Sequence, residues 1–168
     1  MFLRKQRLGY WSGLVLFILL LSGCNSNEKS VIDHYYLSLS GESENWEVKS
    51  YKLELSPDVF NVGNGTITMK NQTMYTTDFI DIKVHAIINN ENEVIQSKKI
   101  IGDNTEINKM TIGAIEGKVE FVDKNGIPIT LENISDIYIE IEWQAVNEKQ
   151  RMQEKIDIYN KETFFNVG

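Results

Sequence analysis

Strict alternation of apolar and polar residues is the feature that most constrains the fold of this chain. Segment 137–143 reads Ile-Tyr-Ile-Glu-Ile-Glu-Trp, and segment 81–88 reads Asp-Ile-Lys-Val-His-Ala-Ile-Ile. Successive side chains of a β-strand point to opposite faces of the sheet, so each segment predicts a strand with one buried face. We expect that face to carry Ile82, Val84, Ala86, Ile88, Ile137, Ile139, Ile141 and Trp143.

A change of phase in segment 46–55 predicts a β-bulge. Trp46 and Val48 alternate in one phase, whereas Tyr51, Leu53 and Leu55 alternate in the other. Because the side-chain period of a strand is two, both sets reach the same face only if one extra residue lies between them. We therefore expect a bulge near Lys49-Ser50.

Further segments predict more strands, separated by turns rich in Asn, Gly and Glu. They are 35–39, 66–70, 94–101, 127–131 and 148–159. Pro128 cannot donate to a ladder, so 127–131 is expected to be an edge strand or the start of a strand. A helix is the competing interpretation of 148–159, whose Glu, Lys, Gln and Met residues are good helix formers; we favour the strand. Asp123–Gly126 predicts a tight turn with Gly at positive φ.

Short strands at roughly 10-residue spacing, with no long amphipathic helical pattern after the first 24 residues, predict an all-β fold. We expect an antiparallel β-sandwich of immunoglobulin-like architecture, with about 7–9 strands. The sandwich is expected to occupy residues 34–160, with a C-terminal tail at 161–168.

The first 24 residues predict an export signal. Three basic residues precede an apolar run, 8–21, that is shorter than the roughly 20 residues of a spanning helix. The run ends in Leu21-Ser22-Gly23-Cys24, which resembles the bacterial lipobox, the recognition sequence of the lipoprotein signal peptidase. The resemblance implies a signal peptide at 1–23, diacylglycerol on the Cys24 thiol, and anchoring on the extracytoplasmic face of the cell membrane. Residues 24–33 are then a polar tether. An ordinary signal peptide and an uncleaved anchor are the alternatives.

A charged turn offers the best candidate for a binding surface. Glu42 and Glu44 precede Trp46 in the sequence Gly-Glu-Ser-Glu-Asn-Trp at 41–46. Packing of Trp46 in the core is the commoner outcome for such a ring. This motif, with a Trp-bearing strand near the C-terminus, resembles small uncharacterised β-sandwich lipoproteins of Gram-positive bacteria. The resemblance implies location and fold, and it carries no activity.

Charge and residue types argue against several functions. Without residues 1–23, 14 of the 17 basic residues remain against 24 acids, a formal net charge of −10, which disfavours nucleic acid as a partner. Cys24 is the only cysteine, so a disulfide or thiolate metal site is not expected. His34 and His85 lack metal-binding spacing, and the loop at Asp123 lacks the final Glu of a calcium loop. We therefore expect no metal and no cofactor.

No motif for a catalytic nucleophile stands in the sequence. Glu140 and Glu142 are paired carboxylates, but residues two apart on a strand form a solvated face. We expect a non-enzymatic binding or structural module of the cell envelope, with an envelope protein as possible partner. The alternative is an accessory solute- or metal-binding lipoprotein of a transporter. A pocket lined by clustered polar groups would favour the alternative or a wall hydrolase, and a fully packed sandwich with no cavity would favour the first hypothesis.

Overall fold

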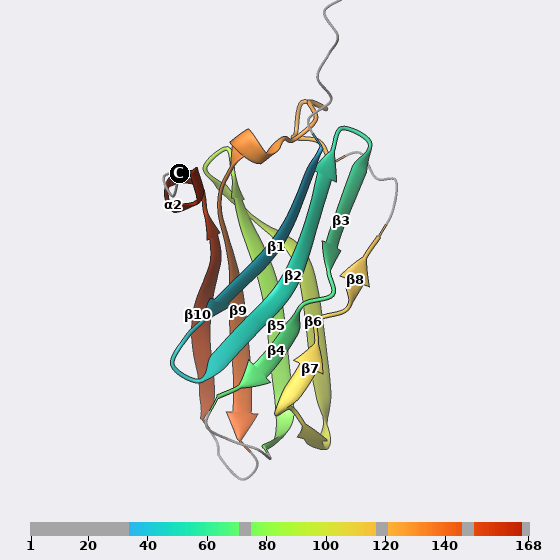
Figure 1. Cartoon of the computed structure of the whole chain (residues 1–168). Coiled ribbons are helices and arrows are strands. Elements are labelled where there is room, and N and C mark those ends of the chain that lie inside the picture. Colours follow the sequence, from blue (N-terminus) through green and yellow to red (C-terminus); the bar gives the residue numbers. More distant parts are fainter. Residues whose placement is uncertain (1–33, 71–74, 117–120, 146–149, 166–168) are drawn as a thin grey trace, which may run out of the picture. The chain divides into compact units, whose positions relative to one another are not determined.

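Two antiparallel β-sheets pack face to face in the computed structural model (Figure 1). The structure describes residues 34–70, 75–116, 121–145 and 150–165, within the compact unit Ile32–Gly168. The first sheet contains β1 (Tyr35–Glu42), β2 (Trp46–Ser56), β3 (Val59–Gly63), β4 (Thr66–Met69), β7 (Lys109–Thr111) and β8 (Ala114–Ile115). The second contains β5 (Thr76–Ile88), β6 (Glu91–Glu106), β9 (Ile134–Ala145) and β10 (Arg151–Asn160). The all-β sandwich is confirmed, whereas the predicted signal peptide, lipobox and Cys24 lie outside the described residues.

The first sheet is centred on β2, and the second is centred on the pair β9 and β5. In the first sheet β2 pairs with β1 on one edge and with β3 and then β4 on the other, while β7 and β8 continue the sheet beyond them. The second sheet has the order β10-β9-β5-β6, so β6 and β10 are its two edge strands. Asn89 and Asn90 close the β5–β6 hairpin with φ of 50° and 66°, the conformation of a two-residue type I′ turn.

The predicted bulge lies in β2. Leu39 pairs with Tyr51 and Gly41 pairs with Val48, so β2 holds one residue more than β1 over this interval. Ser50 takes up the extra residue with φ of 54°. The side chains on both sides of the bulge are consequently buried, and they are Trp46, Val48, Tyr51, Leu53 and Leu55. The bulge expected from the change of phase is confirmed.

Side chains from both sheets fill the core. The eight inward residues expected from the alternation of 81–88 and 137–143 are all 5% exposed or less. Trp46 of the first sheet meets Trp143 of the second edge to face, with ring centroids 5.4 Å apart, a favoured aromatic geometry. Close to this pair, a Cβ on Gly41 of β1 would collide with the Asp157 carbonyl of β10, so glycine permits the two edge strands to approach.

Some boundaries differ from those predicted. β6 extends well beyond 94–101 in both directions. Within the described part of 148–159 the chain forms the strand β10 from Arg151 onward rather than a helix, and residues 148 and 149 lie outside the described residues. Segment 127–131 is not a strand: Pro128 makes one isolated bridge to Val122, and a 3-10 turn (Leu131–Asn133) follows. The turn at Asp123 pairs residues 127–129 with residues 121–123, so this segment does not pair with a strand of either sheet. Among the described residues the tail begins as a short helix, α2 (Lys161–Phe165), and no described helix combines the length and hydrophobicity of a membrane span.

Candidate functional site

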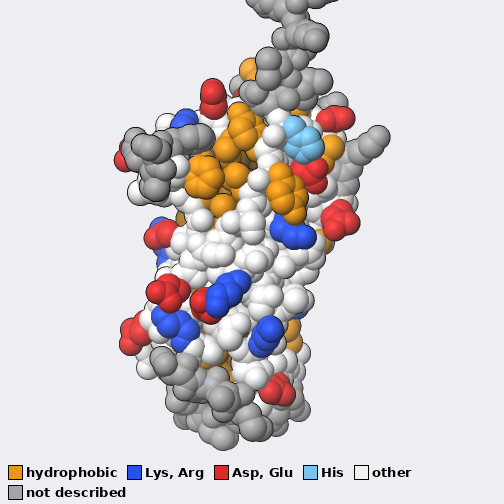
Figure 2. Space-filling model, viewed as in Figure 1, with side chains coloured by type: hydrophobic (Ala, Val, Ile, Leu, Met, Phe, Trp, Pro, Cys, Tyr) orange, Lys and Arg blue, Asp and Glu red, His pale blue; other side chains and the backbone are white. Residues whose placement is uncertain are grey.

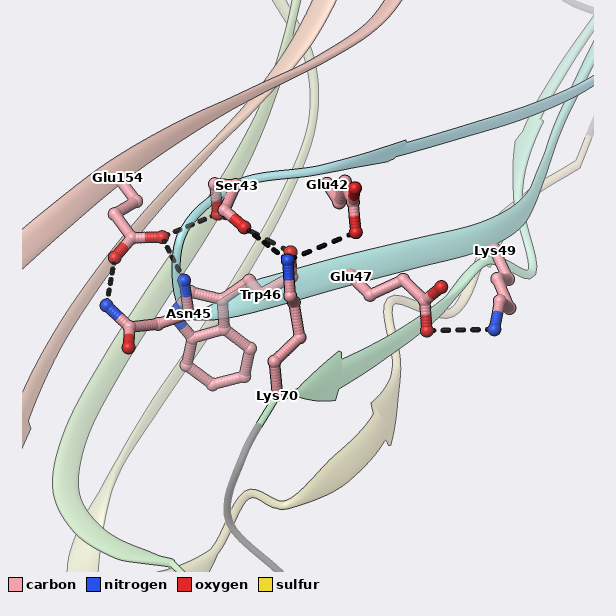
Figure 3. A network of polar contacts seen from close by, with 8 residues as sticks. All are labelled: Glu42, Ser43, Asn45, Trp46, Glu47, Lys49, Lys70 and Glu154. Carbon is pink, nitrogen blue, oxygen red and sulfur yellow. Dashed lines mark hydrogen bonds and ion pairs between the residues drawn. The ribbon is translucent and has the colours of Figure 1, made fainter.

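The charged β1–β2 turn is fastened to the opposite sheet through Glu154 (Figure 3). The Glu154 carboxylate accepts hydrogen bonds from the Ser43 hydroxyl at 2.5 Å, from the Asn45 backbone N–H at 3.0 Å and from the Asn45 side-chain amide. Lys70 donates to the Glu42 carboxylate at 3.1 Å and to the Ser43 carbonyl at 2.9 Å. Burial opposes ionisation of Glu154, but the hydrogen bonds from Ser43 and Asn45 outweigh it and hold the pKa below 4.5.

The structure separates the three residues predicted to bind at this turn. Glu42 is exposed and paired with Lys70, and Glu44 is exposed at the tip. Trp46 is fully buried, so its ring belongs to the core and offers no surface to a ligand. The turn is therefore a polar connection between sheets, and its exposed part consists of the two carboxylates.

A hollow of about 620 Å³ lies at the other end of the sandwich, between the start of β6 and the loop at 121–129. Its size falls in the roughly 300–1,000 Å³ range of small-molecule sites. Apolar side chains from several elements form its floor: Phe60, Ile88, Ile95, Phe121 and Ile129. Phe60 and Phe121 are stacked, with ring centroids 4.0 Å apart.

A bulge in the ladder turns side chains toward this hollow. Val84 of β5 pairs with Gln96, whereas the next residue, His85, pairs with Val94, so Ile95 is the extra residue of β6. Bulges re-aim side chains and often lie beside functional sites. Ile95 consequently joins the floor of the hollow, and Val94 remains 52% exposed at its wall.

The loop at 121–129 forms a rigid wall because its polar groups are bonded internally. The Asp123 carboxylate accepts from the backbone N–H groups of Ile127 at 2.9 Å and Asn125 at 2.8 Å, and these bonds lower the pKa of Asp123. The Ile129 N–H donates to the Phe121 carbonyl at 2.8 Å, and Gly126 takes the expected positive φ of 77°. The predicted turn is confirmed, and it leaves the wall preorganised.

The rim of the hollow is acidic and bridged by one ion pair. Lys124 of the loop lies 2.9 Å from Glu91 of β6, and the hydrogen bond to Glu91 raises the pKa of Lys124. Glu93 and Asp123 add two further carboxylates. The rim therefore carries three acids and one base, a net charge of −2.

The two histidines contribute to other surfaces. His34 Nε2 lies 2.9 Å from Glu54, which also accepts from Asn61, and these hydrogen bonds lower the pKa of Glu54. Beside them the exposed Tyr36 borders a depression of only about 170 Å³. Figure 2 shows apolar side chains gathered toward this end of the first sheet, with charged groups scattered over the rest of that face.

His85 is less exposed than a lone histidine on a polar strand face suggests. It lies on the outer face as predicted, but only 9% is exposed because its ring stacks on Tyr138 with centroids 4.7 Å apart. Its Nδ1 lies 3.0 Å from the Asn92 side-chain oxygen. Within the described ranges no three His, Cys, Asp or Glu residues are grouped as metal ligands would be.

Sequence reasoning missed the hollow, although two of its signals stand in the sequence. Val94-Ile95 breaks the alternation directly after an Asn-rich turn, and Phe121 precedes the Asp123 turn at short range. Their meeting depends on the tertiary fold. No family model, curated protein or solved structure matches this chain.

Proposed function

We propose that this protein is a lipid-anchored, non-enzymatic binding module on the extracytoplasmic face of a bacterial cell membrane. The observation that carries the binding role is the preorganised hollow, whose apolar floor and charged rim stand at the end of a filled sandwich. Rigid scaffolds that position loops in this way are suited to recognition. Leu21, Ser22, Gly23 and Cys24 support the location, since they read as a lipobox.

The electrostatics of the carboxyl groups favour binding over acid catalysis. A general acid needs a pKa raised toward the working pH. Among the described carboxyl groups with a shifted pKa, namely Glu54, Asp123 and Glu154, every shift is downward because each carboxylate accepts hydrogen bonds. These groups are held ionised, which suits fixed negative charges better than proton donors.

A second candidate function is that of an accessory solute-binding lipoprotein of a transporter. The volume of the hollow and the polar groups on its rim favour it. The two functions differ in the size of the occupant, because a small solute fills the hollow alone whereas an envelope protein also covers the rim.

Anchoring is tested by replacing Cys24 with Ala. We expect the parent protein to partition with membranes and to carry a diacylglyceryl group on its N-terminal residue by mass spectrometry. The Cys24→Ala protein should lose this group and remain unprocessed or leave the membrane. An unmodified thiol on the parent protein would refute the anchor.

A further inference from the structure

We propose that the hollow between β6 and the Asp123 loop binds a cationic peptide segment of a partner protein, with an apolar side chain on its floor and Lys or Arg at its rim. The proposal deepens the binding function above and rests on it. It concerns the occupant of the hollow and is independent of how the protein is anchored.

The floor supplies the apolar half of the recognition. Val94 and Val122 remain 52% and 36% exposed at its walls, beside the stacked rings of Phe60 and Phe121. Apolar side chains gathered in a concave surface and rimmed by polar groups are typical of interaction sites. An inserted aliphatic or aromatic side chain would remove this surface from water at little ordering cost to the protein, because the loop wall is already held by its own hydrogen bonds.

The rim supplies the charged half. Glu93 has no hydrogen-bond or ion-pair partner within the described part of the chain. Glu91 is occupied by Lys124, but the two side chains are 61% and 75% exposed, and such surface pairs are weak. An incoming cation can therefore take the place of Lys124 beside Glu91 while a second one meets Glu93.

The overall charge of the chain and the open rim of the hollow favour a peptide. Without residues 1–23 the chain has a formal net charge of −10, which attracts cationic partners over a distance. The hollow is open at the rim, where Glu91 and Glu93 at the start of the edge strand β6 lie beside it. A peptide can thus place an apolar side chain on the floor and meet Glu91 and Glu93 with separate cations, which a free amine cannot do.

Fluorescence anisotropy of a dye-labelled peptide of sequence KFKLK, added to the processed full chain in detergent, tests the proposal. Glu93→Gln should weaken binding about three-fold, the scale of one exposed charge pair. Lys124→Gln should tighten binding by a similar factor, because it frees Glu91 and removes the competing cation. Opposite signs at two neighbouring exposed positions are not expected from a loss of fold.

Matched controls stand at distant sites. Glu44→Gln removes an exposed acid at the β1–β2 turn, and Lys49→Gln removes a lysine that is paired with Glu47 at 2.8 Å, much as Lys124 is paired with Glu91. Both should leave the affinity unchanged. Val94→Ser should weaken binding without changing its salt dependence, since it removes only apolar contact.

The outcomes separate the hypotheses. Absence of binding to KFKLK, equal binding of EFELE, or weaker binding by Lys124→Gln would overturn the proposal. Lysine amide that binds as tightly as the peptide would also overturn it and would indicate a small-solute site. The same preparations report anchoring by membrane partition, so failure of the hollow and failure of the lipid anchor are distinguishable.

Discussion

At the scale of single residues, Glu154 shows how one charge joins segments that are remote in sequence. It lies 109 positions after Asn45, yet its carboxylate accepts the turn's hydroxyl, backbone N–H and amide donors. Hydrogen bonds to a charged acceptor are stronger than neutral ones. The ionised form of Glu154 therefore stabilises the turn, and the protonated form does so less.

This makes the stability of the sandwich sensitive to acid. The pKa of Glu154 is lower in the folded protein than its ordinary value of 4.5, so the stabilisation is complete above that value and is lost as pH falls through the folded pKa. We expect Glu154→Gln to lower the free energy of unfolding by about 1 kcal/mol at pH 7, with the difference shrinking below pH 4.5. Urea unfolding at pH 7 and pH 3 measures it. Glu44→Gln in the same turn is the control, and an equal loss at both pH values would contradict the role of charge.

At the scale of elements, the bulge in β2 decides which side chains of that strand are buried. Removing one residue there would turn Tyr51, Leu53 and Leu55 toward solvent, because the side-chain period is two. The bulge has a conformational cost at Ser50, because a φ of 54° is unfavourable for a residue with a side chain. Its N–H donates to the Ser40 hydroxyl at 3.2 Å, a bond that glycine at position 50 would keep.

Ser50→Gly should therefore stabilise the protein, by about 0.5–1 kcal/mol. The same change at Ser38, an exposed residue of the neighbouring strand β1, should destabilise it because glycine weakens a regular strand. Urea midpoints of both variants provide the comparison. Destabilisation by both substitutions would show that the left-handed backbone at Ser50 carries no strain.

Lys98 protects the edge strand β6 against pairing with another chain. This lysine lies opposite the buried Ile82, so it points between the sheets, and its ammonium donates to the Thr111 carbonyl of β7 at 2.6 Å. An inward charge on an edge strand opposes edge-to-edge association. The protection matters because Val94 and Ile101 are 52% and 74% exposed on the same strand.

Lys98→Val should accordingly make self-association rise with concentration relative to the parent protein. Size-exclusion chromatography with light scattering over a range of concentrations measures the change in mass. Lys52→Val removes the same charge from the outer face of the central strand β2 and should leave the mass unchanged. Identical behaviour of the two variants would mean that net charge, not the strand edge, controls association.

The local alternation of apolar and polar residues was sufficient to predict the strands, but it was insufficient to predict the hollow. Alternation in 81–88 and 137–143 and the phase change in 46–55 each reflect a requirement within one strand, so sequence could predict them. The apolar pattern of 127–131 predicts a strand, but it does not reveal that the Asp123 carboxylate accepts a hydrogen bond from the Ile127 N–H and holds the start of this segment in a loop. The hollow depends on Phe60, Val94 and Phe121 meeting from three parts of the chain, which no single window of sequence contains.

At the scale of the whole domain, the hollow and the charged turn occupy opposite ends of the sandwich. Tyr35, where β1 begins, pairs with Leu55, and Leu55 pairs with Phe60 on the floor of the hollow. β1 then runs eight residues away, roughly 27 Å, to the turn at Ser43–Asn45. The hollow therefore lies at the end where the strand region begins, and Glu44 lies at the far end (Figure 1).

If the proposed lipid anchor holds the domain near Tyr35, the hollow should lie closer to the membrane than the β1–β2 turn does. The eleven residue steps from Cys24 to Tyr35 span at most about 40 Å when fully extended, which limits how far Tyr35, at the hollow's end of the domain, can lie from a lipid on Cys24. With that thiol in a thioether, no other cysteine competes for a maleimide dye. A donor dye on Ile127→Cys, beside the hollow, should transfer more energy to acceptor-labelled lipid headgroups than a donor on Glu44→Cys. Equal transfer from the two positions, or more from Glu44→Cys, would mean that the hollow does not face the membrane, and that its partner must approach from the wall side.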